Sequence, residues 1–376
     1  MKKQIIVVSL FLVLNFVFCK NVFAAPDIDS VNGTFVNSAI VIVTGIDFGV
    51  KYPVAPMLWS DFENGVAGAA LPTVSPWVAY KGNGGLFNSK QHYSGNLAAY
   101  QTYNYTSPDG ESTSNYFFPV EIDETYVSYV TKYHKAGNTI YGQWKNTRIV
   151  GTGQAYNGPG MGGFSDNAPL YDPGPSPIGT MSSPDVRGFT YYQPIDNPLG
   201  IRDENWHRID MYKKLSTPGI TDGQIWENID NDDSNVDYSN SYNHKNLNAI
   251  TRLAGETFKH AGIILGLMHT NTLDGDIHEI WLDDLYVDNT QARLEICSGS
   301  VWASRSHCEV QIPQNNWSNE QIEFKVNQGT FLDNSTAYLY VIDAAGDFNV
   351  YGYSIIFGSS AVDLVAPSAP SGLSVM

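Results

Sequence analysis

The amino-acid sequence predicts an all-β fold, because its composition and the spacing of its apolar residues agree. Tyrosine, threonine, valine, isoleucine and glycine are abundant, with 23 Tyr and 34 Gly in 376 residues, and such a composition favours strands joined by turns. Short runs of alternating apolar and polar residues, the pattern of half-buried strands, recur at 126–133, 143–150, 206–212, 263–269 and 279–287. Because helical periodicity is scarce, we expect a protein of β-sandwiches.

The first residues predict a signal peptide over 1–24. Lys2 and Lys3 precede an apolar run from Ile5 to Phe18, and small residues at Val22 and Ala24 provide a cleavage site. This run is shorter than the roughly 20 residues of a membrane-spanning helix, and no later segment matches it. We therefore expect a secreted protein, extracellular or periplasmic, with no transmembrane anchor in the mature chain.

The charge and the cysteines limit the class of protein further. Loss of residues 1–24 removes three lysines and no acidic residue, so the formal net charge of −17 becomes −20. A nucleic-acid-binding protein needs a basic surface instead, which excludes that class. Cys297 and Cys308 are the two cysteines left after processing, and in an oxidising compartment they predict a disulfide. We expect a monomer.

Two segments far apart in the sequence resemble parts of one immunoglobulin-like module. Pro26–Gly33 and Ala39–Gly49, with Thr-Gly-Ile-Asp-Phe-Gly at its end, resemble the opening of an IPT/TIG domain, and Trp317–Val326 resembles a late strand of the same family. The resemblance implies that 25–55 and 291–360 are two halves of this module and that 361–376 is a tail. The alternative is two unrelated β segments that flank the central region.

The central region, 56–290, resembles a concanavalin-like jelly roll of the kind found in polysaccharide lyases and laminin-G-like lectins. The similarity rests on Pro56–Gly65, on Trp206–Tyr212 followed by Thr221–Trp226, and on Glu279–Val287. It implies a jelly-roll β-sandwich inserted in, or flanked by, a small immunoglobulin-like β-sandwich. These motifs are signatures of the fold and not of a reaction.

Four carboxylates predict a calcium site in this jelly roll. Asp61 and Glu63 lie on its candidate first strand, and Asp283 and Asp284 lie on its candidate last strand. If the strands pair, these oxygens converge, and oxygen ligands suit Ca²⁺. The alternative is a set of solvated carboxylates on an acidic surface.

Strand residues of the central region are the candidates for a catalytic site. Removal of a proton next to a uronate carboxylate needs a base, an acid for the leaving oxygen and a cation or amide near the carboxylate. Residue types that fill these roles in jelly-roll lyases are present at Lys145, Arg148, Arg208, Tyr212 and His269. Each has an ordinary structural alternative, such as an Arg208–Asp210 ion pair or a core tyrosine at 212.

Aromatic side chains on the same strands are the candidates for sugar binding. Trp and Tyr rings pack on the apolar faces of pyranose rings, which favours Trp144, Tyr212 and Trp226. The leading hypothesis is therefore a secreted polysaccharide-binding protein. The alternatives are a polysaccharide lyase that acts by β-elimination on a uronic-acid glycan, and a non-catalytic, adhesin-like structural module. Whether the chain is an enzyme stays open at this point.

Overall fold

The fold is all-β, as predicted. The computed structural model describes residues 24–104, 112–136, 143–152, 162–167, 180–181, 204–230, 245–266 and 277–358. Over these residues the regular elements are strands, together with the short 3-10 helices Leu71–Thr73 and Trp302–Ser304. The predicted signal peptide and tail, and His269, lie outside the described residues. No helix in the described ranges is long and apolar enough to cross a membrane.

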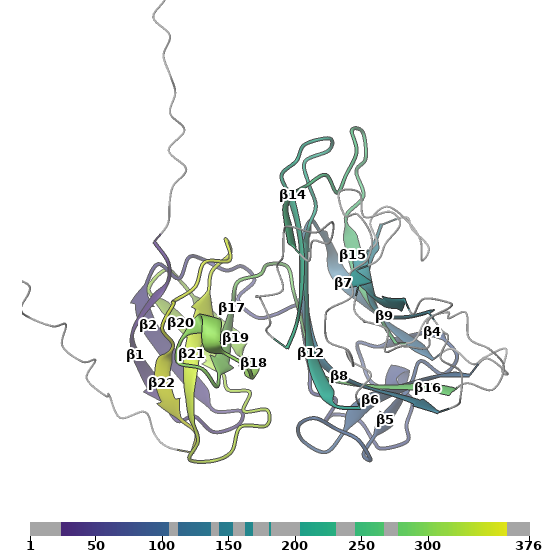
Figure 1. Ribbon diagram of the computed structural model, residues 1–376, viewed down its shortest axis with the longest axis horizontal. Helices are drawn as coiled ribbons and strands as arrows, with labels where there is room; N and C mark the ends of the chain where they lie inside the picture. The colour runs from purple at the N-terminus through teal and green to yellow at the C-terminus, as the bar shows by residue number, and fades with distance from the viewer. Residues whose placement is uncertain are drawn as a thin grey trace, which may run out of the picture.

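Two sheets form a jelly-roll sandwich (Figure 1). The eight-stranded sheet has the order β14-β13-β12-β8-β16-β6-β5, with β3 paired to β16. Its strands are β3 (Leu58–Ser60), β5 (Leu86–Asn88), β6 (Ala98–Asn104), β8 (Glu124–Ala136), β12 (Trp206–Lys214), β13 (Gly223–Ile229), β14 (Lys245–Ala249) and β16 (Ile277–Asp288). The six-stranded sheet, in the order β11-β10-β9-β15-β7-β4, has the strands β4 (Val78–Lys81), β7 (Thr113–Ile122), β9 (Gln143–Gly151), β10 (Gly162–Asn167), β11 (Thr180–Met181) and β15 (His260–Gly266).

The core of the sandwich lies between the two sheets. Alternate residues of β8 and β12, among them Val127, Tyr129, Ile209 and Met211, pack there against the inner face of the six-stranded sheet. Because side chains alternate along a strand, their neighbours point away from the core. This alternation determines which residues reach the outer faces.

Strands from both ends of the chain form a second, smaller sandwich, here called the small module. Its sheets have the orders β1-β2-β20-β19 and β18-β17-β21-β22, and in Figure 1 the purple β1 and β2 lie beside the yellow-green β20. The strands are β1 (Asp27–Gly33), β2 (Ile40–Ile46), β17 (Arg293–Cys297), β18 (Cys308–Val310), β19 (Ile312–Trp317), β20 (Gln321–Lys325), β21 (Thr336–Ile342) and β22 (Tyr353–Ile356). Val43 of β2 pairs with Ile322 of β20, so segments nearly 280 residues apart share one sheet. The IPT/TIG identity and the exact domain bounds stay predictions.

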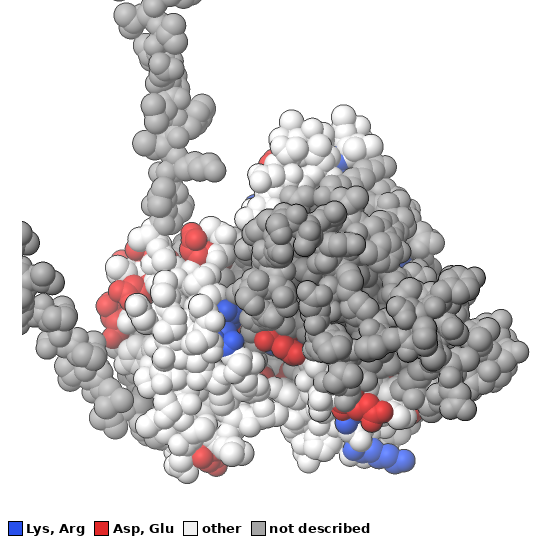
Figure 2. All heavy atoms as spheres, viewed as in Figure 1, with Lys and Arg blue, Asp and Glu red and all other residues white. Residues whose placement is uncertain are grey.

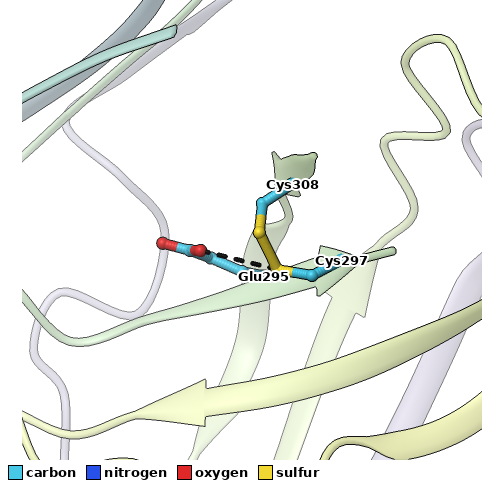
Figure 3. A group of neighbouring side chains, drawn as sticks. All are labelled: Glu295, Cys297 and Cys308. Atoms are coloured by element: carbon cyan, nitrogen blue, oxygen red, sulfur yellow. Dashed lines mark hydrogen bonds between the residues drawn. A yellow bond between two sulfur atoms is a disulfide. The ribbon is translucent and has the colours of Figure 1, made fainter. Parts of the chain in front are cut away.

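The predicted disulfide is confirmed. Cys297 at the end of β17 and Cys308 at the start of β18 are cross-strand partners and are joined by a disulfide (Figure 3). Both side chains are buried beside Trp302 and Tyr340. The disulfide therefore links β17 to the short edge strand β18, which contacts the jelly roll.

Candidate functional site

The outer face of the eight-stranded sheet, the face turned away from the six-stranded sheet, carries several of the predicted site residues. Ile209 and Met211 lie in the core, so Arg208 and Tyr212, which alternate with them, point outward. The small module lies against part of this face, since Arg208 Nη1 donates a hydrogen bond to the Cys308 carbonyl at 3.2 Å. The small module therefore covers this part of the face, here called the covered part.

A network of buried charges occupies the covered part. Arg208 Nη2 lies 2.9 Å from Asp210 Oδ1 and 3.0 Å from Glu295 Oε1 in the small module. Arg293 Nε donates to the same Glu295 oxygen at 2.6 Å. Burial alone would raise the pKa of Glu295, but the charges of Arg208 and Arg293 outweigh it and hold this pKa below its usual value. Glu295 is therefore ionised between the two arginines, and the ordinary interpretation of Arg208 and Asp210 as an ion pair fits this geometry.

Predicted sugar-binding aromatics also lie in the covered part. Tyr212 stacks on Trp226 with ring centroids 5.5 Å apart, and both pack with Tyr126, Tyr286 and Val310. Tyr212 is 1% exposed and Trp226 is 8% exposed. The small module covers Arg208 and Tyr212 in this arrangement, and the catalytic and sugar-binding roles expected of them stay predictions.

Further along the same face lies a row of side chains that sequence analysis did not single out as a site. Three of them are half-buried, and the fourth, Trp281, is 8% exposed. Tyr100 pairs with Trp281, Trp281 with Lys132, and Lys132 with Trp206 across four neighbouring strands. We call these four residues the aromatic row. The Tyr100 and Trp281 rings lie 5.3 Å apart, and Lys132 Nζ donates to Gln91 Oε1 at 3.1 Å. The only sequence signal for this row is that Trp281 alternates with apolar core residues. Alternation shows on which side of the sheet Trp281 lies but not whether another part of the chain covers that side.

Proton-carrying groups lie beside the aromatic row. The Tyr100 hydroxyl donates a hydrogen bond to Glu279, and burial together with this bond raises the pKa of Tyr100. His134 Nδ1 lies 2.9 Å from Glu204 Oε1, and its Nε2 lies 4.0 Å from Glu279 Oε2. The phenol thus stays protonated and serves as a donor, while the imidazole lies between two carboxylates. A histidine in this setting is suited to proton transfer.

The predicted calcium ligands lie where the first and last strands of the jelly roll meet. β3 pairs with β16, with Ser60 opposite Leu285, which brings the two acidic pairs to one region. Glu63 Oε1 accepts the backbone N–H groups of Asn96 and Leu97, both at 2.7 Å. Asp283 Oδ2 accepts the backbone N–H of Tyr93 at 2.8 Å.

One carboxylate oxygen of this cluster is unusual. Asp284 is 6% exposed, and its Oδ2 is buried with no hydrogen-bond partner among the described residues. Burial and the neighbouring carboxylates raise the pKa of Asp284, and burial raises that of Asp283 to about 7. This oxygen lacks a donor, but among the described residues the four predicted ligands do not bring three oxygens within 4.8 Å of one another, so they form no closed cation site in this arrangement.

A second group of potential ligands is not a metal site. The described part of the chain contains one group of three potential ligands that lie close enough to share an ion, namely Glu295, Cys297 and Cys308. Their sulfurs are joined to each other (Figure 3), and a thiolate is the form that binds metal. Glu295 is already bound to two arginines.

The remaining predicted catalytic residues belong to the other sheet. Arg148 of β9 points to the outer face of the six-stranded sheet, because its neighbour Ile149 is in the core. Arg148 is buried, and burial lowers its pKa to about 10. It therefore lies on a different face from Arg208, and the two do not form one site. The side chains of Trp144 and Lys145, like His269, lie outside the described residues.

Comparison with known proteins gives structural similarity only. No family model and no curated protein sequence matches this chain. Among solved structures, the alginate lyase Aly36B is 13% identical, covers 63% of this chain and 98% of its own, and superposes with a TM-score of 0.38. The endo-β-1,4-glucuronan lyase of the fungus Trichoderma reesei (12% identity; 62% and 96% covered; TM-score 0.33) and the alginate lyase vAL-1 of a Chlorella virus (12%; 60% and 99%; 0.38) are also similar. These neighbours are jelly-roll polysaccharide lyases, and similarity this low transfers no activity.

Proposed function

We propose that this chain is an exported protein that binds a polysaccharide on the aromatic row. The observation that supports the proposal is the in-register alignment of Tyr100, Trp281, Lys132 and Trp206 across four strands. Four strands spaced about 4.8 Å apart span about 14 Å, which suits an oligosaccharide better than a single sugar. Aromatic faces bind the apolar faces of sugar rings, and Lys132 offers a cation to a carboxylate or hydroxyl.

On the face shown in Figure 2, most of the described surface is neither acidic nor basic, and the acidic side chains form small separate groups. A uronic-acid polymer would need a local cation, and Lys132 of the aromatic row provides one. A polysaccharide outside the cell is thus the partner that we propose, with this protein as a monomer.

Substitution of Trp206, which is half-buried at the edge of the row, tests this function. We expect Trp206→Ala to weaken binding about tenfold or more, because truncation of a tryptophan that is a binding hot spot removes about 2 kcal/mol or more. Affinity electrophoresis in gels that contain alginate, glucuronan or β-glucan measures the change. Tyr351→Ala is the matched control, because Tyr351 is 74% exposed and lies in the small module. Equal retention of the Trp206→Ala variant and the unmodified protein would contradict the proposal.

A second candidate function, that of a polysaccharide lyase, is supported by the groups beside the row. In β-elimination, His134 would take the proton next to the uronate carboxylate, Lys132 would neutralise that carboxylate, and protonated Tyr100 would supply a proton to the leaving oxygen. The electron pair of the broken C–H bond becomes the new C=C bond as the glycosidic C–O bond breaks. Ultraviolet absorbance of the unsaturated product, with alginate and glucuronan as substrates, measures this reaction. If no uronic-acid polymer yields product while binding persists, the lyase is excluded and the binding protein remains.

We also propose that Asp61, Glu63, Asp283 and Asp284 bind a structural calcium ion, which would draw their oxygens closer together than the 4.8 Å that they do not meet here and would provide the partner that Asp284 Oδ2 lacks. A ligand that binds only the folded state raises the free energy of unfolding, by about 2.7 kcal/mol at a concentration one hundred times its Kd. We expect the melting temperature to rise in CaCl2 relative to EDTA, and this rise to disappear in Asp284→Asn. The control Asp29→Asn changes an exposed carboxylate. A melting temperature that is the same in CaCl2 and EDTA would contradict the calcium proposal, and the four carboxylates would then have no role in metal binding.

A further inference from the structure

One edge of the small module lies near Trp206, the end of the aromatic row. Val310 of β18 packs on the aromatic cluster of the covered part, and the Cys308 carbonyl two residues earlier accepts the hydrogen bond from Arg208. β18 thus lies alongside β12. From Arg208 toward the start of β12, the next residue that points outward is Trp206. The residue before β18, His307, therefore lies at the edge of the small module on the side of Trp206.

Tyr93 connects the two modules at this boundary. Its ring lies 5.8 Å from that of Trp206, and its hydroxyl donates to Glu309 Oε1 of β18 at 2.9 Å. The Thr330 hydroxyl of the small module donates to the same Tyr93 oxygen at 3.4 Å. The Tyr93 backbone N–H is held by Asp283. Groups of the small module thus lie one side chain away from the aromatic row.

Glu309 orients the polar groups beside Tyr93. Its side chain is 2% exposed, and its Oε1 lies 3.1 Å from His307 Nε2 and accepts the Thr330 backbone N–H at 3.2 Å. A carboxylate accepts hydrogen bonds, so His307 Nε2 carries a proton and, in the neutral ring, Nδ1 is an acceptor. The His307 side chain is 34% exposed, and Thr330 is exposed. Thr330 Oγ1 donates to Tyr93 and lies 3.3 Å from His307 Nε2, so the hydroxyl keeps one acceptor site and the imidazole keeps Nδ1 for a further partner.

We propose that the small module forms a second contact region for the glycan, in which His307 and Thr330 hydrogen-bond the sugar unit next to the one that packs on Trp206. The inference rests on the proposed glycan binding and assigns the small module a part in it. Sugar hydroxyls both donate and accept, so an imidazole nitrogen and a hydroxyl side by side are suited to them. Phe331, whose ring lies 4.6 Å from that of His307, supports the imidazole from the module side.

The dependence of affinity on oligosaccharide length tests this second region. A short and a long member of the alginate, glucuronan and cello-oligosaccharide series are titrated calorimetrically into the full chain. Two hydrogen bonds of about 0.7 kcal/mol each correspond to about tenfold in affinity. We therefore expect the variant with both His307→Ala and Thr330→Ala to lose about tenfold for the long member only. Trp206→Ala should lose affinity for both lengths.

Two further variants separate a binding role from a structural one. His307→Gln keeps a hydrogen-bonding side chain and should recover part of the affinity for the long member. Thr336→Ala changes an exposed threonine of the same module and should leave the affinity for both lengths unchanged. If the double variant unfolds, the Thr330→Ala single variant is used for the test. If the variants bind long members as well as the unmodified protein does, this inference is wrong while the proposed function stands. Absence of binding in all three series overturns both.

Discussion

At the scale of single residues, Glu295 holds the buried charges of the module junction together. Its carboxylate contacts two guanidinium groups, one on the jelly roll at Arg208 and one on its own strand at Arg293. The network contains two positive and two negative groups, with Asp210 as the fourth member. Removing one partner of a buried network leaves an uncompensated charge, which costs much more than the loss of a surface ion pair.

We expect Glu295→Gln to lower the free energy of unfolding by about 3 kcal/mol or more near neutral pH. Urea denaturation measures the loss. Glu320→Gln is the matched control, because Glu320 is an exposed glutamate of the same module, and it should have an effect near zero. A loss of the same size in both variants would show that the network has no special role.

The same residue predicts how stability depends on pH. The pKa of Glu295 is below its usual 4.5 in the folded protein, so the unfolded chain binds a proton first as the pH falls. Because the unfolded state then carries more bound protons, the contribution of Glu295 is present above pH 4.5 and is lost as the pH decreases below it. Glu295→Gln should therefore show a weaker decrease in stability than the unmodified protein between pH 5 and pH 3, measured by the same denaturation.

At the scale of elements, β20 decides whether the two ends of the chain form one sheet. It lies between β2 from the start of the chain and β19 from near its end. Ile322 of β20 is fully buried, with Val41 and Val43 of β2 in the same core. Apolar contacts between segments this far apart in sequence therefore stabilise the small module.

Substitution in this core should destabilise the protein. We expect Ile322→Ala to lower the free energy of unfolding by about 2–5 kcal/mol, since deletion of a buried aliphatic side chain leaves a cavity. Ile46→Ala removes the same atoms from a residue that is 50% exposed, and its effect should be well under half as large. If both substitutions had the same effect in thermal or urea denaturation, the shared core would not be the source of stability.

At the scale of the whole molecule, the jelly roll and the small module are joined by two chain connections and a buried junction. The chain leaves the small module after β2 and returns to it at β17. The junction contains the aromatic cluster around Tyr126 and Tyr286 and the Lys51–Asp288 ion pair at 2.8 Å, which is fully buried. A junction of this kind differs from the flexible linker of an independent spacer domain.

We expect the two modules to unfold together in differential scanning calorimetry. Opening the junction exposes large aromatic side chains to water, so neither module keeps its full stability without the other. The expected result is one transition whose calorimetric and van't Hoff enthalpies agree. Two separate transitions would show that the modules are independent and would favour the adhesin-like structural alternative.

The sequence determined the local features, because their causes are local. Alternating apolar residues determine strands, and they predicted the all-β fold that the structure confirms. Cys297 and Cys308 predicted their own disulfide, since they were the one pair left after processing. The motifs around Trp59 and Trp281 predicted first and last strands, and β3 does pair with β16.

Only the tertiary structure decided which part of the outer face the small module covers. In the sequence, Arg208, Tyr212 and Trp226 have the same outward alternation as Lys132, Trp206 and Trp281, so both sets were equally suited to a binding face. The difference is that the small module, built from the two ends of the chain, packs on the first set, whereas Lys132 and Trp206 are half-buried and Trp281 is 8% exposed. Coverage by a distant part of the chain leaves no trace in local periodicity, because alternation records only the side of the strand on which a residue lies.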